Sequence, residues 1–111
     1  MSRENSIISG NNVTNSYLRG IELYSASEFN TISGNNLTNN FRNMYISGSS
    51  HNIISENTIT RSDYEGICFY WAPNNTVSGN TITKSNYDSI ALYWSSSNII
   101  SENNLTDNYH S

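Results

Sequence analysis

The sequence predicts an all-β solenoid: a single domain over residues 1–111, built as a parallel β-helix of about five coils. Three observations predict it. One block of nine residues recurs every 22–24 residues, a second block recurs between its copies, and apolar residues alternate with polar ones inside both blocks. Alternation with a period of two is typical of strands and not of helices.

The first block supplies two short strands to each coil. Its copies start near residues 6, 30, 52, 75 and 98, and they read SIISGNNVT, NTISGNNLT, NIISENTIT, NTVSGNTIT and NIISENNLT. Each copy carries an aliphatic residue at its third position and another at its eighth, separated by a polar stretch that contains serine, glycine or asparagine. We therefore expect a strand, a bend and a second strand in each copy, with the aliphatic residues facing a common core.

The second block supplies a third strand. It reads GIELY from Gly20, NMYIS from Asn43, GICFY from Gly66 and SIALY from Ser89. One coil of 22–24 residues cannot bury its apolar face alone. Stacked coils can do so, because each strand pairs in parallel with its equivalent about 4.8 Å away. The prediction is three short strands per coil, separated by polar turns.

One column of the repeat has the same residue in every coil. Asparagine tolerates the left-handed conformation of a sharp bend, and we expect this conformation at the column. Stacked asparagine amides can also bond to each other along the coil axis, which satisfies buried polar groups. The sequence therefore predicts an asparagine ladder made of Asn11, Asn35, Asn57, Asn80 and Asn103.

Composition narrows the functional classes. Asparagine, serine and threonine number 20, 20 and 9, yet 13 isoleucines, 8 tyrosines and a single proline argue against disorder. The net charge is −4 and the five basic residues are scattered, so no basic stripe for nucleic acid is present. The apolar runs are too short to span a membrane.

The motifs N-x-I-S-G-N-x-I-T and G-I-x-L-Y resemble the pectate-lyase-like right-handed β-helix repeat over residues 6–111. That repeat occurs in carbohydrate-active enzymes, in NosD-like periplasmic proteins and in archaeal or bacterial surface proteins. The resemblance implies a right-handed coil, a working groove along one outer face, and a place outside the cell or on the surface of a prokaryote. No leader is visible in the sequence, so we expect it to have been removed. The fold hosts several chemistries, so function has to be argued from a site.

A possible acidic site precedes the third strand. Arg19, Asn43, Glu65 and Asp88 are aligned there, which makes Glu65 and Asp88 neighbours on consecutive coils. Such a pair could share a proton, bind Ca²⁺ or act on a glycosidic bond. The resemblance implies that an enzyme of this fold would carry one of two sets of motifs. Pectinolytic hydrolases have clustered Asp, Gly-His-Gly and Arg-x-Lys elements, and epimerases have an Asp-Pro-His pattern. This sequence contains none of them. We therefore favour the interpretation that both residues are solvated acids in turns. We expect no catalytic residue, no cofactor and no transition-metal site.

A possible aromatic site follows the third strand. Tyr70-Trp71 and Tyr93-Trp94 hold equivalent places, and Tyr24 continues the tyrosine column, which Ser47 interrupts. Outward rings in a row suit stacking against sugars. The alternative is that the rings cover the edge of the core. Cys68 falls in an outward column, where its thiol is either exposed and reactive or structurally inert.

The leading hypothesis is a non-catalytic β-helix segment of a secreted or cell-surface protein, acting as a rigid spacer or a polysaccharide-contacting face. One alternative is a fragment of a polysaccharide lyase or hydrolase. A further alternative is a structural solenoid that associates end to end. The first block occurs five times and the second four times. From this we expect a length cut from a longer solenoid, or a chain whose ends meet another copy.

Overall fold

The computed structural model describes residues 5–110, which contain fourteen short strands and no helix. The strands are β1 (Ile7–Ser9), β2 (Asn12–Thr14), β3 (Arg19–Leu23), β4 (Thr31–Ser33), β5 (Asn36–Asn40), β6 (Arg42–Ser47), β7 (Ile53–Ser55), β8 (Thr58–Ser62), β9 (Ile67–Tyr70), β10 (Thr76–Ser78), β11 (Thr81–Ser85), β12 (Ile90–Tyr93), β13 (Ile99–Ser101) and β14 (Asn104–Thr106). With no helix in this range, none is present that could cross a membrane.

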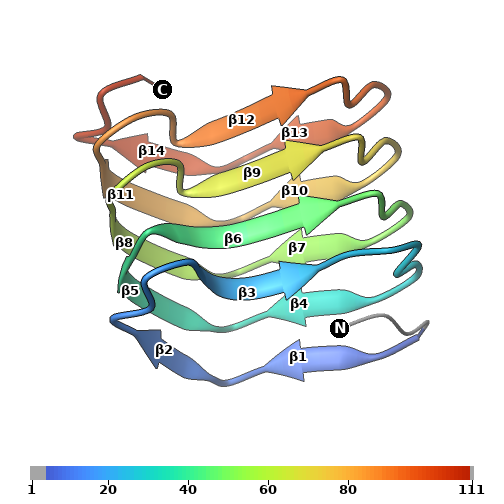
Figure 1. Cartoon of the computed structure of the whole chain (residues 1–111), viewed down its shortest axis with the longest axis horizontal. Helices are drawn as coiled ribbons and strands as arrows, with labels where there is room; N and C mark the ends of the chain where they lie inside the picture. The colour runs from blue at the N-terminus through green and yellow to red at the C-terminus, as the bar shows by residue number, and fades with distance from the viewer. Residues whose placement is uncertain (1–4, 111) are drawn as a thin grey trace.

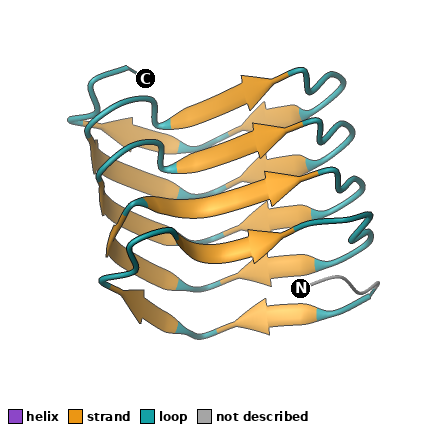
Figure 2. Cartoon of the chain, viewed as in Figure 1, coloured by secondary structure: helices purple, strands orange, loops and turns teal. Residues whose placement is uncertain are grey.

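Three parallel sheets run along the axis of the stack (Figures 1 and 2). Sheet A has the order β1-β4-β7-β10-β13, sheet B has β2-β5-β8-β11-β14, and sheet C has β3-β6-β9-β12. Every strand pairs with the strand one coil away, which confirms the predicted parallel β-solenoid with three strands per coil. Because sheet C has four strands, the chain makes about four complete turns, and the prediction of five coils is slightly too high.

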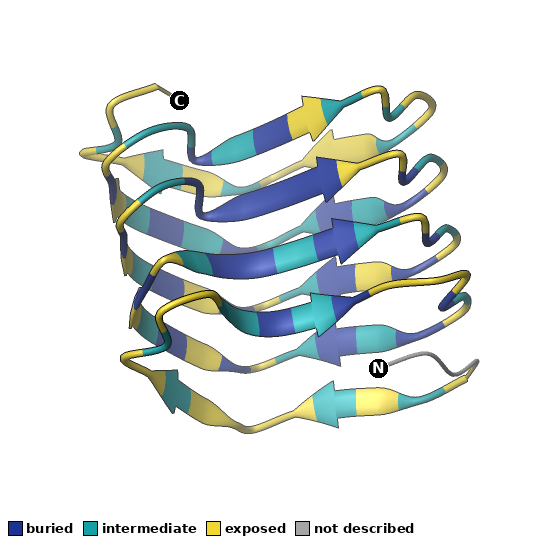
Figure 3. Ribbon diagram, in the orientation of Figure 1, coloured by how far each residue is buried: buried dark blue, intermediate teal, exposed yellow. Residues whose placement is uncertain are grey.

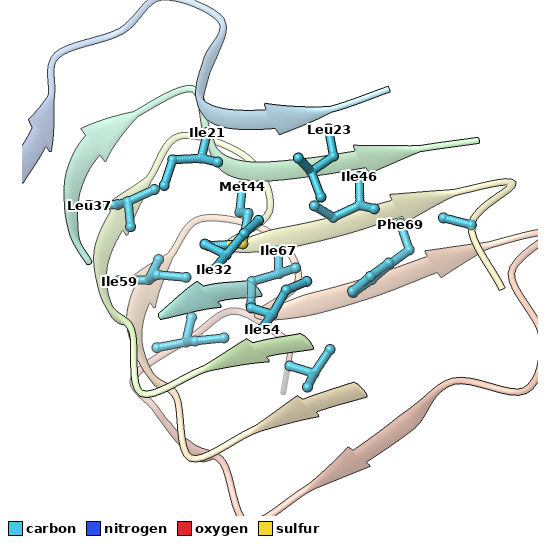
Figure 4. Packing of buried hydrophobic residues seen from close by; sticks show 13 residues of the cluster. Ile21, Leu23, Ile32, Leu37, Met44, Ile46, Ile54, Ile59, Ile67 and Phe69 are labelled. Carbon is cyan, nitrogen blue, oxygen red and sulfur yellow. The ribbon is translucent and has the colours of Figure 1, made fainter. Parts of the chain in front are cut away.

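The pairing register stacks like residues on like residues. Ile32 lies opposite Ile54 in sheet A, and Leu37 lies opposite Ile59 in sheet B. These columns meet the inward residues of sheet C in one core, as Figure 4 shows for Ile46 and Phe69. Figure 3 shows burial to be deepest in the middle coils. In the outermost coils of the described chain the same columns are only partly buried, at Ile8, Val13, Ile90 and Leu105.

The bend between sheets A and B is made by the residue before each ladder asparagine. That residue has a positive φ of 57–68° in all five coils and is Gly10, Gly34, Glu56, Gly79 or Glu102. The prediction that the asparagines themselves are left-handed is therefore wrong. Glycine adopts this conformation without steric cost and takes three of the five places, which leaves the asparagine after it free to turn its amide into the stack.

The ladder asparagines bond to the coils on both sides. The Nδ2 group of Asn57 donates to Oδ1 of Asn80 at 2.9 Å and to the carbonyl of Ile32 at 3.0 Å. Its Oδ1 accepts from the backbone N–H and from Nδ2 of Asn35, both at 3.0 Å. The same pattern links Asn11 to Asn35 and Asn80 to Asn103. Each buried amide thus satisfies backbone groups that the strands leave without partners.

A second ladder, which was not predicted, lies where the chain enters sheet A. Backbone N–H groups one coil away donate to the side-chain Oδ1 of Asn30, Asn52, Asn75 and Asn98 at 2.7–2.9 Å. Its sequence signal is the asparagine that opens four of the five copies of the first block. Sheet A is therefore flanked by an asparagine ladder at each of its bends.

We predict that Asn57→Ala lowers the free energy of unfolding by about 3 kcal/mol, because it leaves several buried polar groups without partners. Urea denaturation followed by circular dichroism measures this change. The matched control is Asn36→Ala, which removes an exposed asparagine next to the ladder and should change stability by less than about 0.5 kcal/mol. Equal effects of the two substitutions would contradict the role given to the ladder.

Candidate functional site

The outer face of sheet C is bordered by aromatic residues along both edges. Side chains alternate along a strand, so this face carries the residues between the core positions, including Tyr45, Cys68 and Ala91. We call the rings before the strands the first aromatic column: Phe41, Tyr64, Tyr87 and His110. We call the rings at and after the strand ends the second aromatic column: Tyr24, Tyr70, Trp71, Tyr93 and Trp94.

The first aromatic column escaped the sequence analysis. Tyr64 stacks on Tyr87 with ring centroids 4.6 Å apart, Phe41 lies 5.8 Å from Tyr64, and His110 meets Tyr87 edge to face at 5.5 Å. A signal was present, because an aromatic residue stands two places before the second, third and fourth copies of the third-strand block. The column closes one side of the sheet C face.

The second aromatic column contains the predicted sugar-contacting residues. The indoles of Trp71 and Trp94 stack at 5.3 Å with an interplanar angle of 7°, and they remain 57% and 65% exposed. Tyr70 is exposed and meets Trp94 edge to face, and its ring lies 6.2 Å from that of the half-buried Tyr93. Tyr24 is exposed one coil beyond Ser47, the residue that interrupts the column. These rings point to solvent more than they cover the core.

The two tryptophans hold a backbone conformation that is unfavourable for them. Their φ angles are 52° and 47°, and the equivalent residue of the preceding coil is Gly48 with φ 58°. A residue with a Cβ loses about 1–2 kcal/mol in this left-handed region, whereas glycine does not. Indole stacking returns about 0.5–1.5 kcal/mol. Large exposed rings therefore occupy positions where glycine would serve the fold at least as well.

A pocket of about 370 Å³ lies between the two aromatic columns. Arg42, Glu65 and Cys68 contribute to its lining, and its aromatic walls are Tyr45, Tyr64, Tyr70, Tyr93 and Trp94. The pocket brings predicted site residues, Glu65 and part of the second aromatic column, together with residues that were not predicted. The latter include Arg42, whose guanidinium lies 4.8 Å from the ring centre of Tyr64.

Glu65 is fully buried beside this pocket, so the expectation of a solvated acid is wrong for this residue. Nε of Arg42 donates to its Oε1 at 2.5 Å, and the hydroxyl of Tyr93 donates to its Oε2 at 3.0 Å. The pairing register places Arg42, not Asn43, opposite Arg19, so the predicted alignment was off by one residue. The guanidinium in the correct column is what compensates the buried carboxylate.

Asp88 has a different partner. It follows Glu65 in the same column, since the backbone N–H of Gly66 donates to the carbonyl of Asp88. Its carboxylate is half-buried and lies 2.8 Å from Nδ1 of His110. Each predicted acid is thus engaged with its own neighbours. Residues 5–110 contain no group of three His, Cys, Asp or Glu side chains arranged to hold a metal ion.

The pocket shifts the pKa values of its own groups. Burial, followed by the charge of Glu65, raises the pKa of the Cys68 thiol to about 12, which contradicts an exposed, reactive cysteine. Burial and the bond to Glu65 also raise the pKa of Tyr93. Burial lowers the pKa of Arg42, but the bond to Glu65 and its charge outweigh this and raise it. Near neutral pH the thiol and the phenol stay protonated, so neither is an activated nucleophile.

Comparison with known proteins supports the fold assignment. The chain matches a family described as "Right handed beta helix region" over residues 1–111, and it belongs to that family. Searches of curated proteins and of solved structures give no match. The family match confirms the predicted right-handed β-helix. The narrower likeness to pectate lyases or NosD-like proteins stays a prediction.

We predict that stability falls as the pH rises above about 8.5, the pKa of a free thiol. Cys68 then loses its proton in the unfolded chain and keeps it in the folded one, up to the folded pKa of about 12. The free energy of unfolding should drop by about 1.4 kcal/mol per pH unit between these limits. Urea denaturation from pH 8 to 10 measures the slope, and Cys68→Ala should flatten it. An unchanged slope in this variant would contradict the assignment.

We also predict that Arg42→Met lowers the free energy of unfolding by about 3 kcal/mol at pH 7, because Glu65 would be left buried without its cation. Chemical denaturation measures the loss. Arg61→Met serves as the control, since Arg61 is exposed and its loss should cost less than about 0.5 kcal/mol. A similar small change in both variants would show that the Arg42–Glu65 pair is not important for stability.

Proposed function

We propose that this chain is a non-catalytic, glycan-contacting segment of a secreted or cell-surface protein, and that sheet C carries the contact face. The observation that supports this most is the exposed, stacked pair Trp71–Trp94, two large rings at a left-handed bend position that glycine fills in the preceding coil. The secreted or surface location is supported by the resemblance alone.

Sugar recognition suits the chemistry of this face. Indole and phenol rings stack on the apolar C–H faces of pyranoses, and phenol hydroxyls and a guanidinium offer hydrogen bonds to sugar hydroxyls. The pocket between the aromatic columns, at about 370 Å³, falls within the usual range of ligand sites. Because Arg42 and Glu65 neutralise each other inside it, the pocket favours an uncharged glycan over a strongly acidic one.

A binding role agrees with the state of the pocket groups. Both oxygens of Glu65 accept hydrogen bonds, from Arg42 and from Tyr93. The raised pKa values of Cys68 and Tyr93 keep both groups protonated and weakly nucleophilic. The asparagine ladders hold the coils in register and keep the rings preorganised, which reduces the entropy lost on binding. The same rigidity supports a spacer role.

We predict that the wild-type chain is retained by at least one neutral glycan in array and affinity-electrophoresis measurements. Tyr70→Ala and Trp94→Ala should each weaken retention about tenfold, the loss expected for one ring contact. Tyr17→Ala is the matched control, because Tyr17 is an exposed tyrosine that does not line the pocket. The absence of any glycan retention by the wild-type chain, folded as judged by circular dichroism, would rule out the binding role.

A further inference from the structure

The second aromatic column lacks a ring at one coil. Strand β6 ends at Ser47, which pairs with Tyr70, and Gly48 follows it. The backbone N–H of Gly48 donates to the carbonyl of Tyr70, and the N–H of Trp71 donates to that of Tyr93, both at 3.0 Å. Gly48 therefore occupies the same position as Trp71 and Trp94, one coil earlier. We call the space over Gly48, next to the indole of Trp71, the open rung.

The open rung has room for a ring. A Cβ placed on Gly48 would have only the backbone nitrogen of Ser25 nearby, at 4.0 Å. The φ of Gly48 is within about ten degrees of the values that the two tryptophans adopt, so this backbone accepts an indole in the following coils. Glycine at this position is therefore not required by crowding. It leaves vacant a place that the fold could fill.

The indole of Trp71 presents a free face toward this space. Its stacking partner is Trp94, which lies on the side away from Gly48. Trp71 nevertheless remains 57% exposed, as expected when one face of the ring is covered and the other is open. A flat apolar surface next to a vacant rung is suited to a ligand ring of similar size.

We infer that one hexopyranose ring of the glycan occupies the open rung and stacks its apolar C–H face on Trp71. This inference rests on the proposed function and adds to it the position and the kind of ring that is bound. The bound sugar would take the place of the aromatic ring that coil lacks. Two polar groups border the position: the side chain of Ser47, which directly precedes Gly48 at the end of β6, and the backbone nitrogen of Ser25.

The surroundings favour a sugar over other flat ligands. A nucleobase would bring phosphates to a chain of net charge −4, which is unfavourable without a basic stripe. An aromatic side chain of a partner protein could stack on Trp71 but has few groups to bond with a serine-rich rim. A pyranose has both an apolar face and a ring of hydroxyls, so it matches the indole and the rim together.

The test places a protein side chain in the open rung, so that a sugar can no longer occupy it. Isothermal titration calorimetry on the full chain would use soluble β-1,4-linked tetrasaccharides of glucose, of N-acetylglucosamine and of galactose. Gly48→Trp should fold, since two following coils carry tryptophan in this conformation, and it should weaken binding about tenfold or more. Gly48→Ala introduces a side chain in the same backbone conformation without filling the rung, and it should bind within about threefold of wild type.

A second variant keeps the test valid if Gly48→Trp does not fold. Trp71→Gly removes the stacking surface and introduces the residue that the preceding coil already carries, and it should lose affinity to the same extent. Fluorescence gives a direct readout, because the chain has two tryptophans and Trp94→Phe leaves Trp71 as the single reporter. Saccharide binding should shift the emission of Trp71 in that variant.

The possible results separate the two proposals. Wild-type binding that is lost in Gly48→Trp and in Trp71→Gly but kept in Gly48→Ala supports the open rung. Equal binding by wild type and Gly48→Trp overturns the open rung and leaves the proposed function standing. Equal loss in Gly48→Ala also overturns it, because backbone strain would then be the cause. Failure of all three saccharides overturns the open rung, and saturation by N-acetyltryptophanamide instead would assign it to an aromatic side chain of a partner. The proposed function itself fails only if the wild type binds no glycan on the array.

Discussion

Backbone groups at the bends of a solenoid have no strand partner, and in this protein asparagine amides provide one. Each amide of the ladder from Asn11 to Asn103 bonds to the next amide and to backbone groups of neighbouring coils. A shift of one residue in any coil would break these bonds and turn the aliphatic columns away from the core. The ladders therefore hold the register of all three sheets, and every column on the outer surface depends on that register.

The register of the coils determines which residues meet on the outer face of sheet C. Residues that lie 23 positions apart in the chain become neighbours, so Arg42 reaches Glu65 and Trp71 stacks on Trp94. None of these contacts is local in sequence. The first and second aromatic columns border a pocket whose charged groups compensate each other, and the rings are exposed in a conformation that costs stability. Binding, rather than covalent chemistry, is the role that we propose for this arrangement.

The strands and the core could be predicted, because period-two alternation and a repeat of constant length leave few other folds. The candidate site was harder to predict from the sequence. The first block repeats at steps of 24, 22, 23 and 23 residues while the third-strand block repeats every 23, so the bends between them differ in length. This variation is why Asn43 was aligned where Arg42 belongs. That one-residue difference hid the cation that pairs with Glu65, and without a partner the residue type alone argues for a solvated acid. The left-handed bend conformation was assigned to the asparagines because asparagine tolerates it, but the residue before each asparagine adopts it instead, and that residue is glycine in only three of the five coils.

Hydrogen exchange of individual amides, followed by NMR, tests most directly whether the ladders hold the coils in register. The backbone N–H groups of Asn35 and Asn57, which donate to ladder amides, should exchange only through global unfolding, with protection equal to that of the core strands. The side-chain amides of Asn35, Asn57 and Asn80 should be slowed as well, in contrast to that of the exposed Asn36. Rapid exchange at the ladder positions alongside protected core strands would contradict the central role given to the asparagines.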